Sequence, residues 1–169
     1  MKTPVITHRG EKSMKNRDLA SLFEENLFVP HLKATTKDEV LVELVDLLVS
    51  QRKIRDKEIV LEMLRQRESL GSTGIGKGVA IPHGRSLAST RLIIVCGRSQ
   101  RGIEFDATDG KPVHLIFMII APYVNRQNLY LVVLGKLAEL LKRKKIRHEL
   151  LGATTFQAFK QIIEGGEEG

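Results

Sequence analysis

The sequence has a single cysteine, no tryptophan and no long apolar run, and each of these shortages excludes a class of protein. Because Cys96 has no second cysteine to pair with, the chain contains neither an intrachain disulfide nor a Cys-x-x-Cys metal or redox motif, which fits a reducing compartment. The most apolar run, Val113–Ala121, is shorter than the roughly 18 residues of a membrane-spanning helix and contains His114. We therefore expect a cytoplasmic protein without a membrane span.

The first 17 residues are basic and polar, and they lack the apolar segment of a secretory signal. The whole chain has 42% hydrophobic and 28% charged residues, as globular proteins do, and its 169 residues correspond to one domain. We expect a flexible basic arm over residues 1–17, one domain over residues 18–164 and a disordered tail over residues 165–169. The net charge of +7 favours acidic partners but does not indicate a reaction.

Capping signals and the spacing of apolar residues predict the helices. Thr36 opens a capping box that Glu39 completes, and the apolar residues behind it predict a helix to about residue 53. Asp56 is the expected N-cap of a second helix, which ends at Gly71. An apolar stripe over residues 129–141 predicts a third helix that ends in a charged run, and a second capping box at residues 154–157 opens a fourth.

Runs of β-branched and apolar residues predict the strands. A short strand over residues 27–32 contains Pro30, which belongs at the edge of a sheet. Three further runs lie at residues 79–81, 92–96 and 113–120, and the last two lack clean alternation, as strands covered on both faces do. Because helices stand before, between and after these strands, the expected fold class is α/β, a single layered domain with a small mixed β-sheet flanked by helices.

Between the second helix and the next strand lies a loop with four glycines in eight residues, from Gly71 to Gly78. Its first seven residues match the Gly-x-x-x-x-Gly-Lys part of a P-loop, but Gly78 stands where a P-loop needs Ser or Thr to hold magnesium. The order is also reversed, because a helix precedes this loop and a strand follows it. The dinucleotide-binding fingerprint fails on the same context. We therefore predict no nucleotide cofactor.

His83 follows Pro82, which restrains the backbone, and precedes Gly84, which we expect to leave open space beside the ring. A neutral imidazole, with an ordinary pKa of about 6.5, is a good nitrogen nucleophile at neutral pH and can carry a phosphoryl group. The amides of the glycine loop and the hydroxyls of Ser72 and Thr73 could stabilise the three phosphoryl oxygens. Taken alone, these residues also allow a structural histidine in a turn.

Residues 67–84 read Arg-Glu-x-x-Gly-Ser-Thr-Gly-Ile-Gly-x-Gly-x-Ala-Ile-Pro-His-Gly. This stretch closely resembles the signature of enzyme IIA domains of the phosphoenolpyruvate-dependent phosphotransferase system, fructose/mannitol class, which includes the nitrogen-regulatory members often called PtsN. The resemblance extends over about residues 19–163, with residues 105–113 and 135–141 also fitting. It implies a small mixed sheet flanked by helices and a histidine, here His83, that is transiently phosphorylated by HPr or its nitrogen-branch counterpart.

The resemblance also assigns roles to individual residues. Arg67 matches the arginine before the family's glycine loop, and its guanidinium fork suits phosphoryl oxygens. Tyr130 stands where the family has a second active-site histidine; a phenol can donate one hydrogen bond but does not readily carry a proton near neutral pH. Lys77 replaces the family's usual asparagine, and it either adds a cation beside the site or points into solvent.

We expect a phosphohistidine carrier with a regulatory role, since neither a IIB domain nor a membrane part is fused to it in this sequence. The alternatives are a sugar-specific component that passes phosphate to a IIB domain, and a binding module of the same fold with impaired transfer. Nucleic-acid binding is disfavoured, because the basic run over residues 142–147 lies at a predicted helix end, where cations favour the dipole. The other histidines lack zinc spacing, so no metal is expected, and His114 is predicted to be hydrogen-bonded in the core.

Overall fold

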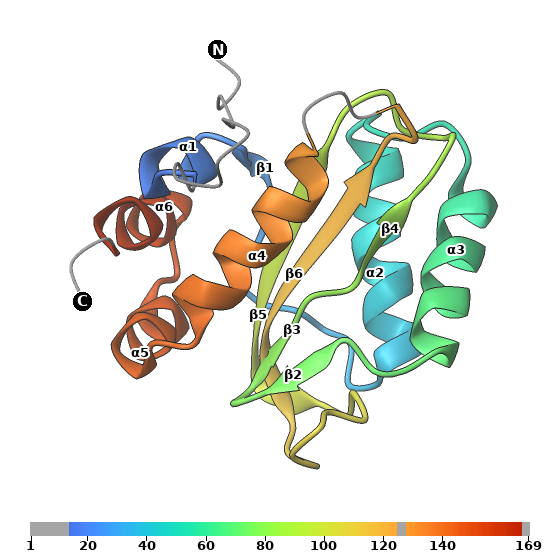
Figure 1. Cartoon of the computed structure of the whole chain (residues 1–169). Helices are drawn as coiled ribbons and strands as arrows, with labels where there is room; N and C mark the ends of the chain where they lie inside the picture. Colours follow the sequence, from blue (N-terminus) through green and yellow to red (C-terminus); the bar gives the residue numbers. More distant parts are fainter. Residues whose placement is uncertain (1–13, 125–127, 167–169) are drawn as a thin grey trace. The chain divides into compact units, whose positions relative to one another are not determined.

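The computed structural model describes residues 14–124 and 128–166, which fall into two compact units (Figure 1). Residues 24–123 contain the sheet and two helices, whereas residues 14–23 and 124–166 form a helical unit. Residues 1–13 of the expected arm and 167–169 of the expected tail lie outside the described residues. The arm's last residues do not stand apart, because Met14 is buried and helix α1 (Asn16–Ala20) begins before the expected domain boundary.

Within the described residues, six strands form one sheet with the order β1-β5-β6-β3-β2, and β4 also pairs with β6. Strands β5 and β6 are antiparallel, whereas β3 and β4 run parallel to β6, so the sheet is mixed as predicted. The edge position of the first strand is also confirmed, although Pro30 lies just after it. The strands are β1 (Phe23–Val29), β2 (Gly74–Gly76), β3 (Val79–Ala80), β4 (His83–Arg85), β5 (Ile93–Ile103) and β6 (Val113–Ala121).

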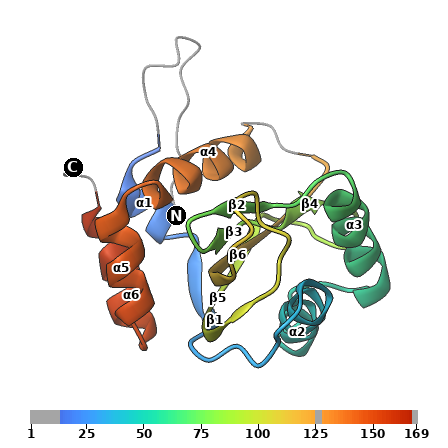
Figure 2. The same ribbon diagram turned by 90° about the horizontal axis from the view of Figure 1, so that it is seen from below.

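Helices α2 (Lys37–Ser50) and α3 (Lys57–Ser69) pack together against one face of the sheet (Figure 2). Both N-caps are as predicted. The Thr36 hydroxyl accepts the N–H of Glu39 at 3.3 Å, and the Asp56 carboxylate accepts that of Glu58 at 3.0 Å. One hydrophobic core joins the apolar faces of α2 and α3 to the sheet, and it includes Ile116, Met118 and Ile120 of β6. The intervening residues of β6 are buried too, which explains why its sequence does not alternate.

The helical unit contains α1, α4 (Leu129–Leu141), α5 (Lys144–Gly152) and α6 (Phe156–Gly165). The helix predicted over residues 129–141 ends at the charged run as expected, but a further helix that was not predicted, α5, begins inside that run. Arg147 donates to the carbonyls of Leu141 at 2.9 Å and Lys142 at 2.7 Å, and Arg143 donates to Gly166, so these arginines fix the corner between helices. The cap of α6 is Thr155, which accepts from Ala158 at 3.2 Å, one residue later than predicted.

No described helix combines the length and the apolar character that crossing a membrane requires. The longest, α2, has 14 residues.

The glycine loop is a β-hairpin rather than an irregular loop, because β2 and β3 pair antiparallel with Gly74 opposite Ala80. Its turn consists of Gly76, Lys77 and Gly78, whose φ angles are 89°, 58° and 78°. Glycine adopts such angles at no steric cost, which accounts for two of the four glycines. The strand predicted at residues 79–81 is confirmed as β3, whereas β2 and β4 were not predicted because runs of three residues carry no periodicity.

Replacing Gly74 by alanine is expected to destabilise the protein by about 1–3 kcal/mol, as overpacking of a tight site does. A Cβ there would lie 2.9 Å from both the Cα and the Cβ of Ala107, so backbone must move. Urea unfolding would measure the loss. Gly135→Ala is the matched control, since nothing lies within 4 Å of a Cβ on this helical glycine, and it is expected to stabilise the protein. Equal stability of the two variants would contradict the prediction.

Candidate active site

His83 is the first residue of β4 and pairs with Ile119 of β6. The carbonyl of Pro82 accepts the N–H of Ile119 at 2.9 Å, which fixes the backbone immediately before the histidine. The half-buried ring places its Nδ1 2.7 Å from the carbonyl oxygen of Ile81. A carbonyl only accepts, so Nδ1 carries the proton of the neutral ring and Nε2 carries the lone pair. The backbone thereby selects which nitrogen is nucleophilic.

The space at Gly84, which we expected to be open, is occupied. A Cβ on Gly84 would overlap the Sδ of Met63, so the side of the strand that glycine leaves uncovered is filled by helix α3. Glycine is needed here because the helix approaches closely, and not because the ring needs room. This close approach brings the last turn of α3, with Arg67 and Glu68, to the histidine.

The pKa of His83 is lowered from its ordinary value, chiefly because burial disfavours the charged ring. The hydrogen bond to Ile81 acts in the opposite direction. Of the nearby charges, Arg67 lowers the pKa and Glu68 raises it. The net direction keeps the ring neutral, and therefore nucleophilic, at neutral pH.

An NMR titration of the His83 ring is expected to show a midpoint below 6.5, because the folded state binds the proton less readily than the unfolded chain. The folded pKa is depressed, so the free energy of unfolding should decrease as the pH falls below about 6.5. Arg67→Gln should move the midpoint upward, since it removes a charge that lowers the pKa. A wild-type midpoint above 6.5 would contradict the role of burial.

Arg67 lies in the last turn of α3, and its Nη1 donates to the carbonyl of Gly71 at 2.8 Å. This contact uses one of the five N–H donors of the guanidinium. Gly74 of the hairpin lies opposite Ala80, and the carbonyl of the neighbouring Thr73 accepts the N–H of Ile81 at 3.0 Å. Gly71 and His83 each lie two residues beyond this hydrogen-bonded pair, at the open end of the hairpin. The arginine is thus held at the end of the hairpin beside the histidine, in agreement with its effect on the histidine pKa.

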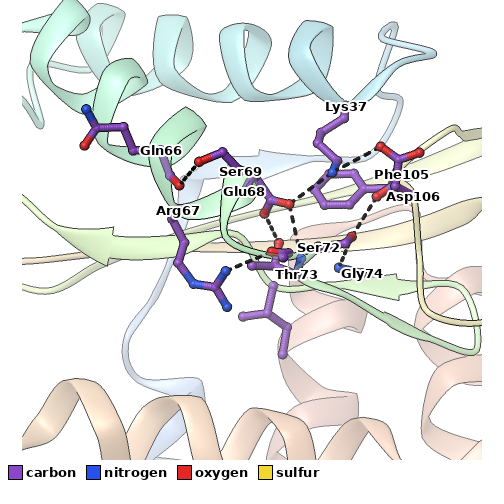
Figure 3. Close-up of polar contacts among 12 residues, drawn as sticks. Lys37, Gln66, Arg67, Glu68, Ser69, Ser72, Thr73, Gly74, Phe105 and Asp106 are labelled. Carbon is purple, nitrogen blue, oxygen red and sulfur yellow. Dashed lines mark hydrogen bonds and ion pairs between the residues drawn. The ribbon is translucent and has the colours of Figure 1, made fainter.

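Glu68 is a buried carboxylate that the sequence analysis did not select (Figure 3). It accepts the N–H of Thr73 at 3.1 Å and also its hydroxyl, and Lys37 Nζ lies 3.2 Å from Oε2. Lys37 also lies 3.4 Å from Asp106 and 5.2 Å from the centre of the Phe105 ring. Helical spacing could have indicated this burial, because Glu68 continues the buried positions of α3.

The hydroxyls of Ser72 and Thr73 hold the loop together in this structure. Ser72 Oγ donates to the carbonyl of Phe105 at 2.8 Å and accepts the N–H of Gly74 at 3.0 Å. Thr73 donates its hydroxyl to Glu68. Their predicted contact with phosphoryl oxygens stays a prediction, and it would require each hydroxyl to exchange a protein acceptor for the ligand.

Lys77 lies at the hairpin tip, away from His83. The strand that follows it, β3, and the strand of His83, β4, both pair with β6. Val79 lies at Leu115 and His83 at Ile119, a separation of about 13 Å at 3.3 Å per residue. Lys77 lies beyond Val79 and is exposed, so of the two interpretations the structure favours a solvent-facing cation.

Two further candidates are His114 and Tyr130. His114 is hydrogen-bonded through Nδ1 to the carbonyl of Ser99 at 2.7 Å, a structural role as expected. Tyr130 is buried as the second residue of α4 and belongs to the helical unit, whereas the residues around His83 belong to the other unit. In the part of the chain that the structure describes, no group of three or more His, Cys, Asp or Glu side chains could hold a metal ion.

Fold and site together define an α/β protein with a half-buried histidine whose ring contacts the backbone and lies beside an arginine. The family model described as "Phosphoenolpyruvate-dependent sugar phosphotransferase system, EIIA 2" matches residues 21–166, and the chain belongs to this family. It is accordingly a component of a phosphotransferase system. The chain is similar both to nitrogen regulatory proteins and to fructose-specific components.

Two relatives and one solved structure show the extent of the similarity. The fructose-specific EIIABC component of Bacillus subtilis is 35% identical over 145 residues, which cover 86% of this chain but only 23% of that protein. A nitrogen regulatory protein of Bradyrhizobium diazoefficiens is 32% identical, covering 86% of this chain and 94% of the relative. The crystal structure of nitrogen regulatory protein IIA-Ntr from Neisseria meningitidis is 34% identical, with a TM-score of 0.79 and coverage of 86% and 98%. The expected family and fold are thereby confirmed.

Proposed function

We propose that this chain is a phosphoryl carrier in which Nε2 of His83 accepts the phosphoryl group from a phosphohistidine of an HPr-like donor. The observation that carries the proposal is the 2.7 Å contact between Nδ1 of His83 and the Ile81 carbonyl. The Nε2 lone pair forms the new N–P bond while the N–P bond to the donor breaks, and the donor nitrogen takes the electron pair. The ring of His83 becomes positively charged in this step, and the Ile81 carbonyl stabilises the Nδ1–H as the charge develops.

Arg67 is the proposed partner of the phosphoryl oxygens, because its fork of donors lies at the end of the hairpin beside His83. Loop amides and the hydroxyls of Ser72 and Thr73 are proposed to contribute further hydrogen bonds. Tyr130 stands in place of a second histidine. Its phenol is proposed to donate one hydrogen bond to a phosphoryl oxygen and to transfer no proton.

The proposed role is regulatory. The support is the nitrogen regulatory protein of Bradyrhizobium diazoefficiens, because the match with this chain covers 94% of that relative. The donor is then the nitrogen-branch counterpart of HPr, and the acceptor is a protein whose binding depends on phosphorylation. The alternative rests on the fructose-specific relative, in which transfer would continue to a IIB domain.

The test is incubation with labelled phosphoenolpyruvate, enzyme I and either HPr or its nitrogen-branch counterpart. We expect an acid-labile, alkali-stable phosphate on the chain, with faster labelling by the nitrogen-branch donor. Adding a fructose-type IIB domain should leave the label in place, and its rapid removal would support the sugar branch instead. The absence of label with both donors would contradict the carrier function.

A further inference from the structure

The glycine hairpin connects a buried ion pair to the His83 ring through successive hydrogen bonds. Glu68 accepts the N–H of Thr73 at 3.1 Å, the Thr73 carbonyl accepts the N–H of Ile81 at 3.0 Å, and the Ile81 carbonyl lies 2.7 Å from His83 Nδ1. Each contact fixes the position of the group that makes the next one. This series of contacts therefore leads from the His83 ring to a carboxylate that belongs to a different element, helix α3.

The carboxylate is itself held from two directions. The Glu68 side chain is only 6% exposed, and it pairs with Lys37, the first residue of α2, at 3.2 Å. Lys37 in turn pairs with Asp106 at 3.4 Å and lies over the ring of Phe105. Figure 3 shows these side chains converging behind the loop from α2, α3 and the segment after β5. A buried charge is tolerated only with such partners, so its geometry is strongly determined.

We infer that the Lys37–Glu68 pair is a positioning element for phosphoryl transfer, which holds Thr73 and Ile81 so that His83 keeps its proton on Nδ1 and presents Nε2. This inference rests on the proposed function, because it assigns a role in the same reaction. Neither residue touches the reacting atoms in it. Both act through the hairpin backbone.

Two substitutions of Glu68 separate its charge from its geometry. In Glu68→Gln, the amide oxygen can replace Oε2, which faces Lys37 and the Thr73 N–H, and the amide nitrogen can donate to the Thr73 hydroxyl. This conservative variant is expected to keep the ring position and to lower the pKa of His83, since the charge of Glu68 raises it. Glu68→Leu fills the space without any hydrogen bond, and it is expected to release Thr73.

The first readout is the state of the ring, obtained from the imidazole ¹⁵N shifts of the purified full-length chain at pH 8. The wild type and Glu68→Gln should show the proton on Nδ1, whereas Glu68→Leu should show a mixture of both tautomers. The second readout is the rate of phosphorylation by phosphoramidate, a small donor that needs no partner protein. Glu68→Leu should reduce this rate by about 10- to 100-fold, as a misplacement of about 1 Å does.

Glu62→Gln is the matched control, because Glu62 lies on the same helix and is exposed. It should change neither readout. If Glu68→Leu does not fold, Thr73→Val supplies the test, since it removes only the hydroxyl bond to Glu68, and it should shift the tautomer ratio in the same direction.

The outcomes separate this inference from the proposed function. A Glu68→Leu variant, or Thr73→Val in its place, whose tautomer and rate equal those of Glu62→Gln would overturn the inference and leave the carrier function standing. A wild type that is never phosphorylated would overturn the carrier function, although a tautomer change in Glu68→Leu would still support the positioning contact.

Discussion

Replacing His83 by alanine is expected to abolish phosphorylation by either protein donor, with residual labelling reduced by more than about 1,000-fold. The imidazole is the proposed site of attack, and the nearby hydroxyls cannot form the acid-labile N–P bond. The one cysteine offers no substitute, because Cys96 is buried and burial raises the pKa of its thiol. Labelling with phosphoenolpyruvate, enzyme I and the donor, followed by quantification of acid-labile phosphate, measures the effect.

His148→Ala is the matched control for this experiment. His148 is an exposed histidine on α5, and its removal should leave the label unchanged. If the acid-labile label is retained in His83→Ala and lost in His148→Ala, the phosphoryl acceptor is His148 and not His83. The circular dichroism spectrum of His83→Ala should match that of the wild type, because the ring is only half-buried.

Replacing Arg67 by glutamine is expected to lower the rate of phosphoryl acceptance by about 100- to 1,000-fold, the usual effect of removing a donor that stabilises charge in the transition state. The rate should be measured at pH 8. The substitution raises the pKa of His83, but at that pH the ring is still neutral in both proteins. The loss of rate then reports on the stabilisation of phosphoryl oxygens and not on the availability of the nucleophile.

Arg67→Lys and Arg55→Gln complete the series. Lysine keeps the charge without the planar fork and should recover only part of the rate. Arg55 is exposed outside the helices, so Arg55→Gln should behave as the wild type. A rate for Arg67→Gln within about threefold of the control would show that the guanidinium serves only to hold Gly71.

The helices of the sheet-bearing unit could be predicted because their signals are local. Thr36 and Asp56 cap their helices through hydrogen bonds to residues two or three positions away, and the sequence contains all the necessary information. At the start of α6 the adjacent Thr154 and Thr155 are both candidate N-caps. The structure uses Thr155, whose hydroxyl accepts the N–H of Ala158 three residues later. Helix α5 was missed because its basic first turn opposes the dipole preference.

The site depends on contacts that sequence spacing does not contain. The choice of the Nδ1 proton on His83 arises from a carbonyl two residues away, and only the strand geometry brings the two together. Likewise, Lys37 and Glu68 are 31 positions apart, and α2 and α3 must pack before they meet. Family resemblance selected His83 and Arg67, but it left two interpretations of Lys77 open, and only the pairing of β3 and β4 with β6 favours the solvent-facing one.

The position of the phosphoryl group on the labelled chain tests most directly which atom of the protein accepts it. ³¹P and ¹⁵N NMR of the uniformly ¹⁵N-labelled, phosphorylated protein would show which nitrogen of which histidine carries phosphorus. We predict Nε2 of His83, with the proton retained on Nδ1 toward the Ile81 carbonyl. Phosphorus on Nδ1 of His83, or on any other residue, would contradict the proposal that the backbone selects the nucleophilic nitrogen.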